Sequence, residues 1–547
     1  MCGILFTNKQ IIDLQRTIKF LKKRGPDHTE HKIINGYNFI HVLLSMTGEG
    51  LTIQPFIYDN IVILFNGEIY NYKDFGDFNS DGECIIESYK KHGRNFIREL
   101  DGEFAIILLD FNSNELFYST DIFSTKPLWV AIDGKEIGIS SYESCLKELK
   151  LKNIKQVKAN STVCLQLDEL KKGKTRYETQ TVYDFDLNQH KTTYDDWNSA
   201  FERSILKRTK NIKHGVYLGL SGGYDSGLIA CVLSKLNIDY KPYSILGSEN
   251  PEIINARQNW KKTDRSQGEI IEISREEFLK ENKYLKENCE EYILKIENGE
   301  RQKFIRYHME ILRLQQLRSN PDIIRNYINA ATNILKTYKF RMRDQMVTDD
   351  NGSIGLSYIC NKAEKEGYKI YLSGSGADEI ISDYGYNGIK HYGHSTIGGF
   401  FPNDLSEVFP WKNFFDNTQR SYLMKEEVVS GSHGVEGRYP FLDKDVVQEF
   451  LWLSADLKNK NYKSVIYNYL KRENYPFEEN KKVGFGCGFS GPSPNKDQSF
   501  KKISSNNKQY TPVGTNINMK VDLNFDKLCE DYIKRKNINF EKLFDKI

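Results

Sequence analysis

Residues 214–226, HGVYLGLSGGYDS, predict a buried strand that runs into a glycine-rich loop and then into a helix. Residues 214–220 form the short, β-branched and apolar run typical of such a strand. The helix is predicted from Gly227 onwards, where LIACVLSKL follows the loop. A strand, a glycine loop and a helix N-terminus in this order present backbone N–H groups to an anion. Because the loop has no Gly-Lys-Ser/Thr ending, it is not a Walker P-loop.

Two later segments extend this pattern. LSGSGADEI, residues 372–380, follows a short predicted strand at 368–371 and again joins it to a Ser-Gly loop; GVEGRYPFLD, residues 434–443, is the third block. Helical patterns such as residues 193–208 alternate with strands near 215, 240 and 369, as a parallel sheet requires. A site on such a sheet lies beyond the carboxyl ends of its strands, where both Ser-Gly loops are expected.

The amino terminus supplies a second candidate site. Cys2 follows the initiator methionine, and removal of the methionine would leave a cysteine with a free α-amino group. A terminal amine titrates at about 7.7–8.0, so the thiol would have its own base beside it. Cys2 is therefore a candidate nucleophile that needs no distant histidine.

Three short segments supply partners for that nucleophile. Arg24-Gly25-Pro26-Asp27 is a turn-forming sequence. Asn66-Gly67 follows the apolar run 61–65, which predicts a buried strand. A strand ending in Asn-Gly can aim a side-chain amide and a backbone N–H at one point, which is the minimum oxyanion hole. The third segment, Asp81-Gly82-Glu83, carries carboxylates that can hold a substrate ammonium.

At these residues the chain resembles the class II glutamine amidotransferases, N-terminal-nucleophile hydrolases that release ammonia from glutamine. The resemblance continues through QPF (54–56), LDGEFAIILLD (100–110) and KPLW (126–129), and it covers about the first 185 residues. It implies an αββα sandwich of the Ntn-hydrolase type. It also implies that Cys2 is the nucleophile, that Asn66 and the Gly67 N–H form the oxyanion hole, and that Glu68 and Asp81 bind the glutamine α-amino group.

The second half resembles the ATP-pyrophosphatase superfamily, a parallel-sheet fold of the adenine nucleotide α-hydrolase type. Its members cleave ATP between the α and β phosphates to adenylate an oxygen, commonly that of a carboxylate. The three blocks in this order, behind a class II glutaminase domain, resemble asparagine synthetase of the glutamine-hydrolysing type. This likeness spans nearly the whole chain, with a glutaminase domain at 1–185, a synthetase domain at 192–547 and a polar linker around 171–191.

The resemblance implies ATP and Mg²⁺ as cofactors and assigns residues to them. Asp225 and Asp378 would be the magnesium carboxylates, which suits an ion that takes one or two carboxylates plus phosphate oxygens. Lys463 would neutralise the leaving phosphates, although a solvated lysine is an equal alternative. Arg438 and Asp443 receive no chemical role. The residues implied to bind the ATP phosphates are Ser221, Gly222, Gly223, Asp225, Ser226, Ser373, Gly374 and Lys463.

The implied reaction converts aspartate to asparagine with glutamine and ATP as the other substrates, and with AMP and pyrophosphate as products. Ammonia would pass inside the protein from the glutaminase site to a β-aspartyl-AMP. The resemblance leaves open whether the chain forms a homodimer. Residues 300–346, rich in helix formers and basic residues, predict amphipathic surface helices rather than a substrate lid. KKVGF (481–485) resembles the closing motif of the family.

Several positions depart from the family pattern. Leu43 stands where an arginine usually clamps the glutamine α-carboxylate, and losing such a charge-assisted partner costs about 1.5–3 kcal/mol. Thr120 and Ser124 replace an arginine and a glycine beside KPLW. In the acceptor pocket, Ser375 replaces a glutamate and Asn351 replaces an arginine that helps to hold aspartate. Two alternatives therefore stay open: a ligase that amidates a different carboxylic acid, and a catalytically impaired or ammonia-only relative with a regulatory role.

Composition agrees with a cytoplasmic enzyme. The 547 residues include 77 basic and 74 acidic residues, for a net charge of +3, so no strong field attracts the chain to nucleic acid or to a membrane. Nine cysteines show neither CxxC pairs nor zinc spacing, which favours a reducing compartment. No apolar run approaches the length of a membrane span, and there is no secretory signal pattern.

Overall fold

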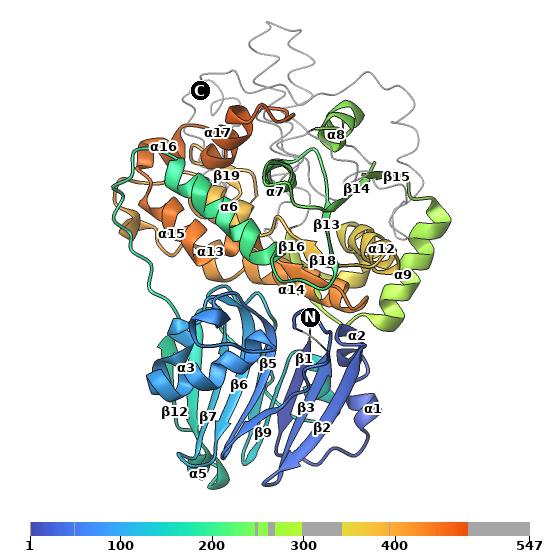
Figure 1. The fold of residues 1–547 in the computed structure, drawn as a ribbon, viewed down its shortest axis with the longest axis vertical. Helices are drawn as coiled ribbons and strands as arrows, with labels where there is room; N and C mark the ends of the chain where they lie inside the picture. The colour runs from blue at the N-terminus through green and yellow to red at the C-terminus, as the bar shows by residue number, and fades with distance from the viewer. Residues whose placement is uncertain are drawn as a thin grey trace, which may run out of the picture.

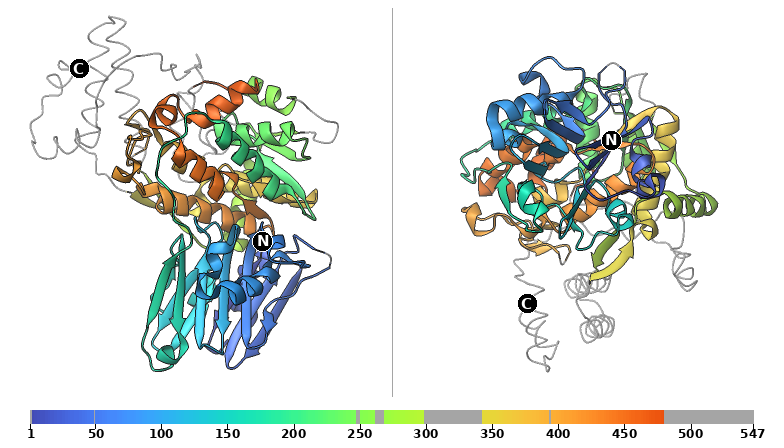
Figure 2. Two further views of the ribbon diagram at one scale, coloured as in Figure 1. Left: turned by 60° about the vertical axis from the view of Figure 1, so that its left-hand side comes forward. Right: turned by 90° about the horizontal axis from the view of Figure 1, so that it is seen from below.

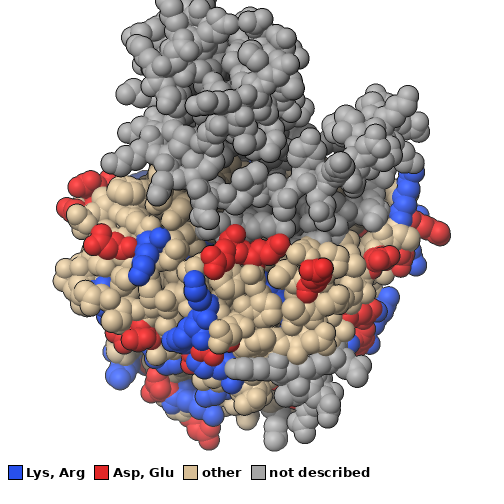
Figure 3. Space-filling view, turned by 90° about the horizontal axis from the view of Figure 1, so that it is seen from above, with Lys and Arg blue, Asp and Glu red and all other residues tan. Residues whose placement is uncertain are grey.

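The computed structural model describes residues 2–48, 50–246, 250–260, 268–297, 342–392 and 394–479. These residues form two stacked parts, an antiparallel β-sandwich and, above it, a parallel sheet covered by helices (Figure 1). Turned by 60° about the vertical axis, the molecule shows the two parts in the same order, with the N-terminus near their boundary (Figure 2, left). On the face seen from above, the described basic and acidic side chains are interspersed (Figure 3).

The sandwich consists of two six-stranded sheets, in both of which all neighbouring strands are antiparallel. The first sheet has the order β10 (Lys155–Gln156), β8 (Trp129–Asp133), β9 (Glu136–Ser140), β1 (Gly3–Thr7), β3 (Tyr37–Leu43), β2 (His28–Ile34). The second has the order β12 (Tyr177–Thr181), β11 (Ser161–Gln166), β7 (Glu115–Thr120), β6 (Gly102–Asp110), β5 (Ile61–Ile69), β4 (Phe56–Tyr58).

Helices cover both outer faces of the sandwich. The first sheet is covered by α1 (Leu14–Thr17), α2 (Leu21–Arg24) and α4 (Glu143–Glu148), and the second by α3 (Cys84–His92) and the 3₁₀ turns η3 (Gly93–Glu99). Apolar side chains such as Phe39, Leu64 and Ile107 fill the space between the sheets. The short helix α5 (Leu167–Lys171) packs at one end. This arrangement confirms the predicted αββα sandwich.

The strand before the Asn-Gly pair is longer than predicted. It does not stop at Phe65 but continues as β5 through Asn66, Gly67 and Glu68 to Ile69, paired with β6 along its whole length. Pairing with β6 compensates for the weak strand preference of Asn and Gly, because the ladder satisfies their backbone groups. Asn66 and Gly67 are therefore held by a sheet and not by a turn.

The second part is built on a five-stranded parallel sheet, as predicted. Its order is β15 (Glu269–Ile271), β14 (Lys241–Ile245), β13 (Gly215–Gly219), β18 (Tyr368–Leu372), β21 (Glu436–Arg438). The two strands expected before the Ser-Gly loops, β13 and β18, are neighbours. Their loops consequently leave the same edge of the sheet side by side.

Side chains alternate between the two faces of this sheet, and each face has its own core. Val216 and Leu218 of β13 pack with α6 (Asp195–Thr209) and α7 (Tyr224–Lys235), whereas Tyr217 packs with α12 (Asn351–Lys365). The other helices of this part are α8 (Pro251–Gln258), α9 (Arg275–Asn288), α13 (Lys412–Phe415), α14 (Thr418–Gly431), α15 (Lys444–Trp452), α16 (Ala455–Asn459) and α17 (Ser464–Arg472).

Two short antiparallel strand pairs complete the described structure. They are β16 (Ile293–Glu297) with β17 (Met342–Met346) and β19 (Gly385–Tyr386) with β20 (Ile389–Lys390). Residues 342–346 thus form a strand, where a helical segment was predicted for 300–346; the rest of that segment and KKVGF lie outside the described residues. The polar stretch 171–191 also contains β12, so it is only partly a linker. No described helix is long and apolar enough to cross a membrane.

Buried charges hold the two parts together. Glu427 of α14 accepts from Arg24 at 2.9 Å and from Tyr439 at 2.9 Å, and lies 3.2 Å from the Lys126 ammonium. Nearby, Glu103 of β6 accepts from Arg208 of α6 at 2.7 Å. Both carboxylates are almost completely shielded from solvent. Ion pairs thus connect the sandwich to the helical part at several points.

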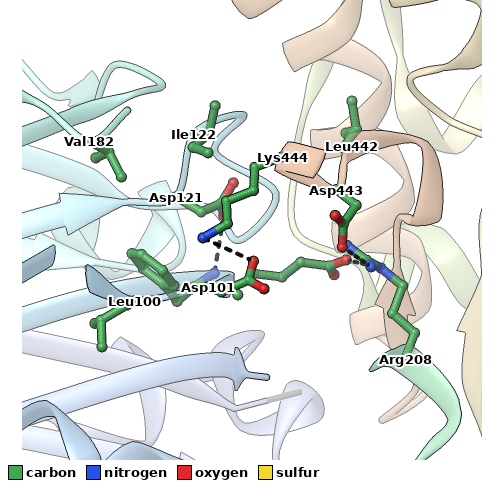
Figure 4. Close-up of a pocket in the computed structure, with 12 residues that line it drawn as sticks. Leu100, Asp101, Asp121, Ile122, Val182, Arg208, Leu442, Asp443 and Lys444 are labelled. Atoms are coloured by element: carbon green, nitrogen blue, oxygen red, sulfur yellow. Dashed lines mark hydrogen bonds and ion pairs between the residues drawn. The ribbon is translucent and has the colours of Figure 1, made fainter. Parts of the chain in front are cut away.

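The same interface encloses a small cavity of about 20 Å³ (Figure 4). Asp101 comes from the sandwich side, and Arg208, Asp443 and Lys444 come from the other side. Arg208 lies 2.9 Å from Asp443, and Lys444 lies 3.9 Å from Asp101. Asp443, given no chemical role from the sequence, is thus part of the domain interface.

We expect Glu427→Gln to lower the free energy of unfolding by about 3–5 kcal/mol, because it removes the nearest carboxylate of two buried cations, Arg24 and Lys126. Urea denaturation would measure the change. Glu143→Gln, which removes an exposed ion pair with Lys147 on α4, is the matched control and should cost about 1 kcal/mol or less. A loss below 1 kcal/mol for Glu427→Gln would contradict the role given to this carboxylate.

Candidate functional site

Cys2 lies immediately before β1, at the boundary between the two parts, and is only partly exposed. Its Sγ lies 3.8 Å from the Leu44 carbonyl oxygen, and the Arg24 guanidinium donates to the Cys2 carbonyl oxygen at 2.9 Å. Burial raises the pKa of the Cys2 thiol to about 11, and the carboxylates of Glu436 and Glu68 add to this. The thiol is consequently protonated at neutral pH, and attack on a carbonyl carbon requires a base.

Asn66 and Gly67 occupy the part of β5 that the sequence assigned to an oxyanion hole. Asn66 is completely buried, and its side-chain amide has no hydrogen-bond partner among the described residues. Gly67 has a φ of +135°, and a side chain there would collide with the Glu103 carbonyl. β5 and β1 contact each other across the sandwich. The buried Asn66 amide, on a strand that contacts the strand after Cys2, has the unused donors that a tetrahedral oxyanion needs.

The two carboxylates predicted to hold an ammonium lie together with this thiol. Asp81, in the short helix η2 (Asp81–Glu83), accepts from the Ile69 N–H at 2.7 Å. Burial raises the pKa of Asp81 to about 6, and it also raises the pKa of Glu68, for which Arg438 partly compensates. Each carboxylate thus lacks the full counter-charge that it would gain from a bound ammonium.

The second part contributes side chains to this site that the sequence did not indicate. Arg438 of β21 forms ion pairs with Glu68 at 3.1 Å and with Glu436 at 2.7 Å. Burial raises the pKa of Glu436, but the positive charge of the amino terminus, Arg438 and Lys126 together hold this pKa well below its usual range. GVEGRYPFLD was recognisable as a motif, yet only the packing of β21 against the sandwich shows which site its side chains face.

A cavity of about 270 Å³ opens beside Glu68. Thr47, Tyr70 and Tyr72 line it from the sandwich. From the helical part it is lined by four cations, Arg203, Lys207, Lys210 and Arg438. Glu68 at one side and the four cations at the other form a suitable environment for an amino-acid zwitterion, and Cys2, Asn66 and Asp81 lie outside the lining of this cavity.

The predicted phosphate loop joins β13 to α7 through Ser221, Gly222 and Gly223. The hydroxyls of Ser221 and Ser226 lie 2.8 Å apart, and the Gly223 N–H donates to Ser221 Oγ at 3.1 Å. Arg257 of α8, which sequence reasoning missed, donates to the carbonyls of Gly223, at 2.8 Å, and Ser221. These bonds direct the carbonyls of Ser221 and Gly223 toward Arg257. The N-terminus of α7 can therefore present its N–H groups to an anion without competition from these carbonyls.

Lys463 brings the two predicted magnesium carboxylates together. Its ammonium lies 2.5 Å from Asp225 Oδ1 and 2.8 Å from Asp378 Oδ1. Lys463 is buried and has a left-handed backbone, with φ +47°, a conformation that proteins retain mainly where function requires it. The lysine is therefore a partner of both aspartates and not a solvated side chain.

The two Ser-Gly loops are in direct contact. Gly374, in the loop after β18, leaves so little room that a Cβ atom would lie 2.9 Å from Asp225 Cβ. Ser373, in the same loop, donates its N–H to the Arg438 carbonyl at 2.9 Å. Two carboxylates fit a magnesium ion that takes its other ligands from phosphate. Within the described residues, no group of three or more His, Cys, Asp or Glu forms a metal cluster.

The structure also gives the contacts or the backbone conformation of the positions that depart from the family pattern. Ser375 donates from Oγ to Glu426 of α14 at 2.9 Å. Asn351 is the first residue of α12, next to Asp350, which lies 3.4 Å from the Lys425 ammonium. Leu43 is a buried apolar residue at the end of β3. Ser124 has a φ of +54°, the left-handed region that favours glycine.

Comparisons with known proteins agree with these two sites. A family described as glutamine amidotransferase domain matches residues 1–181, and one described as asparagine synthase matches residues 329–428. The chain is 25% identical over 513 residues to a putative glutamine-hydrolysing asparagine synthetase 1 of Methanocaldococcus jannaschii. The alignment covers 83% of this chain and 80% of that protein. It is 26% identical over 526 residues to the glutamine-hydrolysing asparagine synthetase of Gallus gallus, with coverages of 87% and 81%.

A solved structure of an allosteric regulatory enzyme of purine biosynthesis aligns with 49% of this chain and 80% of that chain, at 12% identity and a TM-score of 0.28. An overall score this low carries no conclusion.

Proposed function

We propose that this chain, which belongs to the asparagine synthetase family, uses glutamine nitrogen and ATP to amidate a carboxylic acid, with aspartate as the acid and asparagine as the product. The observation that carries the proposal is the pair of sites in one chain. One has a thiol at the start of β1 and an unpartnered amide on β5, which contacts β1, and the other has two carboxylates joined by Lys463 at a glycine loop.

In the glutaminase reaction, Cys2 attacks the carboxamide carbon of glutamine after removal of Met1. The free α-amine takes the thiol proton, which is required because the thiol is protonated at neutral pH. Asn66 and the Gly67 N–H stabilise the oxyanion, and Glu68 and Asp81 bind the α-ammonium group. Ammonia leaves, and water hydrolyses the thioester to give glutamate.

In the synthetase reaction, the loop at Ser221 to Ser226 and the loop at Ser373 and Gly374 hold the phosphates of ATP. Asp225 and Asp378 would hold Mg²⁺, which supplies charge neutralisation to the phosphates when bound. Lys463 lies between these aspartates and would neutralise the leaving pyrophosphate. The carboxylate of the acid displaces pyrophosphate to form an acyl-AMP, and ammonia displaces AMP to give the amide.

Two alternatives correspond to particular residues. Ser375 and Asn351 favour a ligase for a different carboxylic acid, which a screen of acids in ATP–pyrophosphate exchange would identify. Leu43 favours an ammonia-only or regulatory relative, but the buried, unpartnered amide of Asn66 argues against a lost glutaminase.

The missing arginine at Leu43 has a candidate replacement in the second part. Of the four cations of the 270 Å³ cavity, Lys207 and Arg438 form ion pairs with carboxylates, whereas Arg203 and Lys210 form none within the described part of the chain. We infer that Arg203, with Lys210 beside it, binds the glutamine α-carboxylate while Glu68 and Asp81 bind the α-ammonium. The clamp would then come from α6 and not from β3.

The proposed function is tested by Cys2→Ala, which also permits removal of Met1. We expect it to abolish glutamine-dependent amide formation by at least about 10³-fold and to leave the ammonia-dependent reaction intact, because only the first site loses its nucleophile. Quantifying amide, glutamate, AMP and pyrophosphate checks this, with Cys164→Ala as control. Formation of ADP in place of AMP would reject the assigned chemistry.

The KM for glutamine should rise as the pH falls below about 6. The pKa of Asp81 is raised to about 6, so this carboxylate is charged above that pH and neutral below it, where it no longer attracts an ammonium. KM measured between pH 5 and pH 8 would show the change. Asp81→Asn should raise KM at pH 8 and remove most of the dependence; an unchanged profile would contradict the assignment.

Arg203→Met should raise the KM for glutamine by about 10–100-fold, the cost of losing one charge-assisted partner. The ammonia-dependent reaction should be unaffected, since ammonia does not use the clamp. Arg472→Met, which removes a partly exposed cation of α17, is the control. Equal KM values for the two variants would exclude Arg203 as the carboxylate ligand.

A further inference from the structure

Two consecutive glutamates of α14 face the two sites of this protein. Glu427 accepts from Arg24, and Arg24 in turn donates to the carbonyl of Cys2. Glu426 accepts from Ser375, in the loop that contacts Asp225. Two adjacent residues of α14 are thus connected, one through Arg24 to the backbone of Cys2 and the other to the second Ser-Gly loop.

The surroundings of Glu426 are unusual for a structural carboxylate. Its Oε1 accepts the Ser375 hydroxyl at 2.9 Å, but its Oε2 is shielded from solvent and has no hydrogen-bond partner among the described residues. Burial raises the pKa of Glu426, and the hydroxyls of Ser373 and Ser375 with the Lys425 ammonium only partly compensate. A shielded carboxylate oxygen without a partner costs about 1–3 kcal/mol or more. Such a cost is expected where the oxygen acquires a partner during function.

We propose that Glu426 receives the nitrogen nucleophile in the synthetase site. This inference rests on the proposed function. Oε2 of Glu426 accepts a hydrogen bond from ammonia and orients its lone pair toward the acyl carbon of the acyl-AMP. As the new C–N bond forms, the C–O bond to AMP breaks and AMP leaves with the electron pair. Oε2 takes the proton that the nitrogen loses.

The position of Ser375 agrees with this role. Ser375 fixes the Glu426 carboxylate through Oγ, and its own N–H donates to Ser373 Oγ at 3.0 Å. Ser373 and Gly374 belong to the loop proposed to hold the phosphates of ATP. The carboxylate is therefore tied to the loop at which the acyl-AMP forms, and it lies on the side of that loop that faces α14. The loop itself supplies only the hydroxyl of Ser375, and the carboxylate beside it comes from Glu426 of α14.

One other role for Glu426 gives a different experimental result. Lys425 is the preceding residue, and its ammonium lies 3.4 Å from Asp350 at the start of α12. An ammonium of the acceptor acid could pair with Glu426 while Lys425 holds its carboxylate. In that case Glu426 would act before adenylation and not after it, so the two roles separate in partial reactions.

The test measures three reactions of the full chain carrying Glu426→Gln: glutamine hydrolysis, aspartate-dependent ATP–pyrophosphate exchange, and amide formation from glutamine or from free ammonia. We expect amide formation from either nitrogen source to fall by about 10²–10⁴-fold, the contribution of a positioned general base. Hydrolysis and exchange, which precede the nitrogen transfer, should stay within about threefold. Retained exchange also shows that the synthetase domain is folded.

Further variants test whether the effect is specific to the carboxylate at Glu426. Glu290→Gln alters another buried glutamate that accepts from a serine, Ser144, outside both sites, and it should leave all three reactions intact. In Glu426→Ala with Ser375→Glu, the carboxylate moves to the neighbouring side chain and should restore part of the amide formation lost in Glu426→Ala alone.

Loss of exchange in Glu426→Gln would overturn the inference in favour of acceptor binding, and unchanged amide formation would overturn it outright. If the unmodified protein showed neither exchange nor amide formation with any acid tested, the proposed function would fail as well. The failure of each claim is thus recognised by a different measurement.

Discussion

The structure depends on one constraint, that a carboxylate buried between two domains must find a cation in the other domain. Glu427 does so through Arg24 and Lys126 of the sandwich, and Glu103 does so in the opposite direction through Arg208 of α6. Separation of the domains would leave these charges unpaired or would require them to be solvated again. Such pairs fix a relative position more than they add stability, because the loss of hydration offsets much of the attraction. The interface therefore mainly fixes the position of one site relative to the other.

This fixed relative position places a side chain of one domain in the site of the other. β21 belongs to the parallel sheet, yet its Arg438 pairs with Glu68 beside Cys2. β21 in turn neighbours β18, which precedes the second Ser-Gly loop.

The departures from the family pattern have a common structural solution. Where β3 offers Leu43 in place of a cation, α6 directs Arg203 and Lys210 into the cavity beside Glu68. Where the second Ser-Gly loop offers Ser375, α14 supplies Glu426 at hydrogen-bond distance. In both cases a charged group is available from a neighbouring helix. Comparison with the motif alone scores each position as a loss and does not detect these charged groups.

The sequence by itself determined the order of the elements. The apolar run before SGGYDS required a buried strand, and the strand–loop–helix order fixed a parallel sheet with its site at the carboxyl edge. Likewise, Cys2 and Asn66-Gly67 were predicted as parts of the first site from their order in the chain and from the family resemblance that they carry. Tertiary structure alone decided the rest. That Arg438 reaches Glu68, that Lys463 joins Asp225 and Asp378, and that Glu426 meets Ser375 depends on contacts between residues tens to hundreds of positions apart. No local pattern encodes such contacts, since they follow from how sheets and helices pack and from the need of each buried charge for a partner.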